Sequence, residues 1–162
     1  MRQLFIKQKV FKITDHYPVL DANGNNVYFV DEKFRFFGKT INVTRSDGSH
    51  VFTIDRKLFN FMYRFRATFY DGKQIVLKNK FRFFRMGIDV ISNDYKLSLE
   101  GDFFALNFEV FSNGNKVGHI YKKWLSWGDC FTIDVIDDEF EEELLALMIM
   151  VDFIQDQQKK SN

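Results

Sequence analysis

One segment near the C-terminus constrains the fold of this chain more than any other, the unbroken apolar run from Leu144 to Val151. Asp137 and Asp138 precede it and can cap a helix, and the glutamates that follow them suit the positive end of a helix dipole. The run has eight residues, whereas a bilayer-spanning helix takes about 20. A helix without a polar stripe must be buried on every side, so the rest of the chain has to surround it.

A repeat of about 24 residues indicates how the chain does so. Each copy opens with a lysine that is followed by an aromatic or apolar cluster. The opening residues are Lys9, Lys33, Lys57, Lys80 and Lys123. The last interval is 43 residues, which leaves room for one degenerate copy near Gly101 to Phe104 that lacks the lysine.

The second half of the repeat is a turn with glycine, which four of the copies contain. These turns lie at 21–24, 46–48, 70–72 and 112–114. Asn-Gly and Asp-Gly supply the positive φ that tight hairpin turns need. Apolar and polar residues alternate most plainly from Phe59 to Phe69, which is typical of a strand with one buried face. Two strands in each of six periods predict about twelve strands within residues 4–136.

We therefore predict a mainly β fold, a closed antiparallel barrel of about twelve strands around a central hydrophobic C-terminal α-helix over 138–157. Closure removes the exposed edges of so long a meander. A barrel of this size is too wide for strand side chains alone to fill, and the apolar helix would fill it. A chain of 162 residues is usually one domain, so residues 1–162 are expected to fold as a unit.

Three runs of sequence resemble the LURP-one-related proteins, the bacterial branch of the tubby C-terminal-like superfamily, which includes phospholipid scramblases. They are LFIKQKVF at 4–11, KKWLSWGD at 122–129, and ELLAL at 143–147 followed by VD at 151–152. The resemblance covers essentially the whole chain and implies a twelve-stranded barrel around a C-terminal helix. Tubby domains bind phosphoinositide headgroups, but none of their ligand residues can be matched to a position of this chain.

Charge is distributed unevenly along the sequence, although the net charge is only +1. Residues 1–128 hold 21 Lys and Arg against 12 Asp and Glu, a balance of +9. Residues 129–162 hold 2 against 10, a balance of −8. One interpretation is internal compensation, in which the acidic segment docks on a basic body. The other is a basic face for an anionic partner such as a lipid headgroup.

The repeat also predicts where the basic residues lie. Equivalent points of successive repeats in a meander share one rim of the barrel, so the lysines are expected at one rim and the glycine turns at the other. The helix would begin at the glycine turns and end among the lysines, where its negative dipole end meets positive charge. The candidate headgroup-binding residues are Lys9, Lys33, Arg35, Lys57, Lys80, Arg82, Arg85, Lys122 and Lys123.

The sequence predicts no catalytic residue, metal site or cofactor. His16, His50 and His119 each lie near a predicted turn or strand end and lack the spacing of metal ligands. Each is expected to be solvent-exposed or strand-terminal. Cys130, the single cysteine, is expected to be a buried, inert thiol on the last strand. Asp152 needs a partner if it is buried. One interpretation of Asp152 is a structural ion pair or hydrogen bond with a barrel residue. The other is a functional proton or ion site.

The preferred hypothesis for function is a non-enzymatic binding module, cytoplasmic and peripherally associated with anionic membrane. The N-terminus has no apolar signal region, and one cysteine fits a reducing compartment. Two alternatives stay open, a carrier of a small apolar ligand in a lipocalin-like barrel and a scramblase-like lipid mover. Nucleic-acid binding is disfavoured, because the aromatics interleaved with arginine at 81–85 are more simply core residues.

Overall fold

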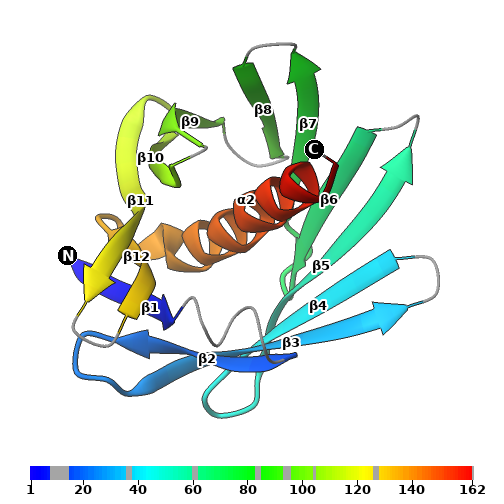
Figure 1. Cartoon of the computed structure of the whole chain (residues 1–162). Helices are drawn as coiled ribbons and strands as arrows, with labels where there is room; N and C mark the ends of the chain where they lie inside the picture. The colour runs from blue at the N-terminus through cyan, green and yellow to red at the C-terminus, as the bar shows by residue number, and fades with distance from the viewer. Residues whose placement is uncertain are drawn as a thin grey trace.

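The fold is a curled antiparallel sheet with one helix inside it. The computed structural model describes residues 1–7, 15–35, 38–59, 62–82, 85–92, 96–103, 105–125 and 128–161. Twelve strands surround the helix α2 (Glu141–Ser161). Figure 1 shows this helix passing through the middle of the ring of strands. The predicted barrel around a central C-terminal helix is therefore confirmed.

The strands follow one another around the sheet in chain order. They are β1 (Arg2–Lys7), β2 (His16–Asp21), β3 (Asn26–Arg35), β4 (Gly38–Arg45), β5 (His50–Phe59), β6 (Met62–Phe69), β7 (Gln74–Arg82), β8 (Arg85–Ser92), β9 (Leu97–Asp102), β10 (Asn107–Ser112), β11 (Asn115–Leu125) and β12 (Gly128–Val135). The first and last strands pair along β1, from Arg2 opposite Val135 to Lys7 opposite Cys130. Among the described residues no ladder joins β8 to β9, so the barrel is nearly closed, with one seam between these two strands.

Each strand turns one face toward the helix, and β6 illustrates why the sequence alternates. Phe65, Ala67 and Phe69 are buried, whereas Arg64 is exposed and Arg66 is half-buried. Successive side chains of a strand point to opposite faces, so the apolar set lines the lumen and the polar set meets solvent. The predicted alternation is confirmed over Phe65 to Phe69.

The glycine turns join strands at one end of the barrel. Gly24, Gly48, Gly72 and Gly114 have φ between 83° and 88°, as predicted for tight hairpins. Backbone hydrogen bonds tie two of these turns to the adjacent strands, from the Ser46 N–H to the Val27 carbonyl of β3 and from the Tyr70 N–H to the Val51 carbonyl of β5. We call this end the glycine rim, defined by residues 21–25, 45–49, 69–73, 112–115 and 136–137.

The chain enters the lumen at the glycine rim. Asp137 accepts a hydrogen bond from the Glu139 N–H and caps the 3-10 turn η1 (Asp138–Phe140), and α2 (Glu141–Ser161) follows. Every side chain from Leu144 to Val151 is 0% exposed. The helix contacts β5, β6 and β7 as well as β11 and β12, strands that are far apart in the sheet order.

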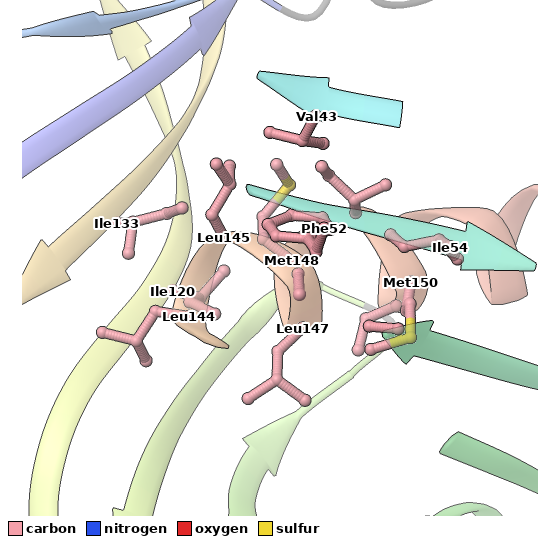
Figure 2. Packing of buried hydrophobic residues seen from close by; sticks show 14 of the residues in the cluster. Val43, Phe52, Ile54, Ile120, Ile133, Leu144, Leu145, Leu147, Met148 and Met150 are labelled. Carbon is pink, nitrogen blue, oxygen red and sulfur yellow. The ribbon is translucent and has the colours of Figure 1, made fainter. Parts of the chain in front are cut away.

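Figure 2 shows how this core is packed. Val43, Phe52 and Ile54 lie on one side of the helix, and Ile120 and Ile133 lie on another. Strand side chains therefore meet the helix on more than one face. A helix that is apolar all round is stable only in such a setting.

Candidate functional site

The strands carry the predicted basic residues to the end of the barrel opposite the glycine rim. β3 and β7 end there at Arg35 and Arg82, and β8 begins there at Arg85. We call this end the lysine rim, defined by Lys33, Arg35, Lys57, Lys80, Arg82, Arg85, Lys122 and Lys123. The ninth predicted residue, Lys9, lies outside the described residues.

Three lysine-rim side chains are described individually. Lys33 and Lys123 are exposed, and Lys122 is half-buried. Lys122 lies opposite Phe131 in the β11–β12 register, and its Nζ is 5.3 Å from the centre of the Phe131 ring. A cation held over an aromatic face gains electrostatic stabilisation. For the remaining five, the structure describes the backbone position and not the side chain.

A buried polar cluster lies inside the barrel, formed by Tyr17, Glu32 and Asp152. Tyr17 is fully buried, and Asp152 on the helix is 2% exposed. Burial raises the pKa of Tyr17 well above its usual value, and the charges of Glu32 and Asp152 raise it further. Asp152 on the helix thus acts electrostatically on Tyr17 of β2. Glu32 was not predicted from the sequence to be buried. Its position two residues after Val30 nevertheless places it on the inward face of β3.

The acidic start of the helix forms ion pairs at the glycine rim. The Tyr28 hydroxyl donates to Glu141 Oε1 over 2.6 Å, and Arg2 Nη1 lies 3.0 Å from Glu141 Oε2. The next two residues continue the pattern, with Glu142 paired to Arg45 and Glu143 Oε1 lying 3.9 Å from Lys73 Nζ. The acidic segment therefore docks on the basic body here, as the internal-compensation interpretation predicts.

Removal of the Tyr28 hydroxyl tests this docking. We expect Tyr28→Phe to lower the free energy of unfolding by about 1–3 kcal/mol, because the buried Glu141 carboxylate loses a charge-assisted hydrogen bond. Urea denaturation followed by circular dichroism measures the change. Tyr70→Phe is the matched control, since Tyr70 is 67% exposed and the ring is kept. Equal stability of the Tyr28→Phe variant and the wild type would contradict the docking.

Cys130 is buried on β12, as predicted, and its thiol donates to the Phe131 carbonyl. Burial is the main cause that raises the pKa of Cys130 to about 11. The thiolate is the reactive form of cysteine, so we expect the folded protein to react slowly with a disulfide reagent at pH 8. The rate should increase as the pH rises toward the pKa, and denaturant should make the reaction rapid. Stoichiometric labelling of the folded protein within minutes at pH 8 would contradict this assignment.

The histidines occupy outer positions on the sheet. His16 begins β2, where its Nδ1 is 2.5 Å from Asp31 Oδ1, and His50 begins β5. The prediction that all three lie near turns or strand ends is wrong for His119, which lies inside β11 and bonds Asn107 across the ladder. In the described part of the chain, no group of three or more His, Cys, Asp or Glu side chains could hold a metal ion.

Comparison with known proteins agrees with this architecture, a nearly closed antiparallel barrel that encloses a helix of its own chain. The LURP-one-related family model matches residues 2–152, so the chain belongs to this family. It is 28% identical over 157 residues to the uncharacterized protein YxjI of Bacillus subtilis (strain 168), covering 95% of this chain and 94% of the relative.

The same fold is found in a solved structure from a plant. The Arabidopsis thaliana protein AT5G01750 superposes with a TM-score of 0.60, over 93% of this chain and 91% of that chain. The two sequences are 15% identical, so the likeness concerns the fold. Among the described residues, no helix combines the length and the apolar character that a membrane crossing requires.

Proposed function

We propose that this protein is a non-enzymatic binding module whose lysine rim contacts anionic phospholipid headgroups at the cytoplasmic surface of a membrane. The family and the barrel fold are consistent with a binding module. The observation that carries the proposal is the separation of charge between the two ends of the barrel. Strand ends gather basic residues at the lysine rim, whereas the acidic helix start is paired with Arg2, Arg45 and Lys73 at the glycine rim.

This pairing engages the acidic start of the helix at the end of the lumen that lies away from the lysine rim. Glu141, Glu142 and Glu143 lie at the opposite end of the lumen from Lys33 and Lys123. Each Lys or Arg close to an anionic membrane contributes about 1 kcal/mol, and the attraction decays over a Debye length of about 10 Å at 0.1 M salt. A ring of such residues at one end would bind the surface reversibly.

The apolar helix favours surface binding over a lipocalin-like carrier. The side chains from Leu144 to Val151 are fully buried against the strands, so the helix occupies the space that an apolar ligand would need. The charged rim, in contrast, is reachable from outside through the exposed Lys33 and Lys123.

Vesicle sedimentation tests the proposal with a matched pair of charge reversals. Lys123 at the lysine rim and Lys96 beside the glycine rim are both exposed lysines, and Lys96 is placed by a hydrogen bond from the Asn113 N–H to its carbonyl. We expect the protein to bind phosphatidylcholine vesicles that contain about 30% phosphatidylserine more tightly than vesicles of phosphatidylcholine alone. Lys123→Glu should weaken it about tenfold, because it replaces attraction by repulsion. Lys96→Glu should change it by less than about twofold.

Two outcomes would contradict the proposal. One is equal binding to neutral and anionic vesicles at low salt. The other is an equal loss of binding for Lys123→Glu and Lys96→Glu, which would place the contact elsewhere than at the lysine rim. The same vesicles loaded with a fluorescent lipid separate binding from scramblase-like lipid movement.

A further inference from the structure

The seam of the barrel has two strand edges. β8 and β9 are the two ends of the twelve-stranded sheet, and in the described ranges no ladder connects them, whereas every other strand is paired on both sides. Both strands can be followed in Figure 1, where they end the ring at either side of the seam. An unpaired edge presents backbone N–H and C=O groups that can pair with another chain.

The core is incompletely covered at this seam. Val90 on β8 lies opposite Leu77, and Leu99 on β9 lies opposite Val110. Leu77 and Val110 are buried, but Val90 and Leu99 are only partly buried although they pack against the same core. Apolar side chains that line the lumen therefore remain partly accessible where the two edges face each other.

The outer face of the seam exposes an apolar and an acidic side chain. Ile91 on β8 is 42% exposed, which makes it one of the few exposed large apolar residues in the described ranges. Glu100 on β9 is exposed and lies directly opposite Glu109, a like charge that is itself paired with Lys116. Like charges directly opposite each other destabilise a sheet. Glu100 has no ion-pair partner within the described part of the chain.

We propose that the free edge of β9 binds an extended segment of a partner protein by β-strand addition, and that this segment alternates apolar with basic residues. Its main chain would pair with Leu97–Asp102, and six residues of strand span about 20 Å. Its apolar side chains would cover Val90 and Leu99, and a basic side chain would face Glu100. This proposal is independent of the lipid-binding function, because the lysine rim takes no part in it.

Charge complementarity selects a partner protein over a second copy of this chain. Glu100 and Asp102 lie on the same outer face of β9, since they are two residues apart in a strand. Antiparallel pairing of two β9 edges would bring the acidic side chains of both copies onto one surface. Their repulsion opposes a homodimer through this edge.

Two labelled peptides of matched length provide the test. One is TVKVKVT and the other is TVEVEVT, each blocked at both ends, and fluorescence anisotropy measures their binding to the full-length protein. We expect the lysine peptide to bind at least tenfold more tightly, a ratio of about ten corresponding to about 1.4 kcal/mol. Glu100→Lys should abolish or reverse the preference. Glu139→Lys, an exposed acid on η1, should leave it unchanged.

Hydrogen exchange then locates the bound peptide. The proposal predicts slower amide exchange in Leu97–Asp102 when the lysine peptide is present. Equal affinity for both peptides, or protection confined to other strands, would overturn it. Sedimentation velocity provides a further check. If the protein dimerised with increasing concentration and Glu100→Lys changed that dimerisation, a second copy of the chain would occupy the β9 edge and the proposal would be overturned.

Discussion

Replacing Leu147 by aspartate is expected to unfold the protein or to lower its free energy of unfolding by about 4 kcal/mol or more. Leu147 is fully buried in the middle of the apolar run of α2. An aspartate there would remove the packing of the leucine and place a carboxylate in the lumen. The loss is comparable with the whole stability of an ordinary domain, about 5–15 kcal/mol. Thermal melting followed by circular dichroism measures it.

A volume-conserving substitution at the same position separates charge from shape. Leu147→Met should cost less than about 1.5 kcal/mol, because methionine fills a similar volume without a polar group. If Leu147→Asp melted at the temperature of the wild type, the helix would have to lie outside the ring of strands.

Replacing Gly118 by valine is the second large effect that we expect. A Cβ at Gly118 on β11 would lie 2.5 Å from Leu144 Cδ1 and 3.0 Å from the Asp134 carbonyl oxygen. Leu144 is fully buried and has little room to move. Overpacking of a filled core costs about 1–3 kcal/mol, and we expect Gly118→Val at the upper end of that range in urea denaturation.

The double variant with Leu144→Ala identifies the cause. Leu144→Ala alone should cost about 2–5 kcal/mol. The valine is expected to destabilise the protein because it contacts Leu144. If so, the double variant should lose at least about 1 kcal/mol less free energy of unfolding than the sum of the two single losses. Strict additivity would show that Gly118 and Leu144 are not in contact.

The barrel could be predicted because its causes are local and repeated. Asn-Gly and Asp-Gly pairs set the turns, and period-two alternation assigns the buried face of a strand such as β6. The apolar run from Leu144 to Val151 has one physical solution, complete burial, and that solution fixes the place of the helix.

The missed features depend on contacts between distant residues. Tyr28 and Glu141 are 113 residues apart, and Arg45 and Glu142 are 97 apart. The sequence indicated that acidic and basic parts could meet, but not which residues would form pairs. The predicted binding role of the lysine rim stays a prediction, because the strand ends fix the rim and not its ligand.

The seam between β8 and β9 also lay beyond the sequence. Each of these strands has a partner on one side, and the alternation within a strand does not depend on whether the second side is paired. Whether the two ends of a long meander meet depends on the twist and curvature of the whole sheet. Twist and curvature accumulate over all twelve strands, so no local sequence pattern predicts whether β8 and β9 will pair.

The location of the helix can be measured directly by nuclear Overhauser contacts in solution. We expect contacts between the Leu144 methyl groups and Gly118 on β11, and between the rings of Phe153 and Phe65 on β6, whose centres are 6.5 Å apart. β11 and β6 are far apart in the sheet order, so only a helix within the ring can reach both. Contacts from α2 to one of these strands without the other, or to neither, would contradict a helix in the lumen.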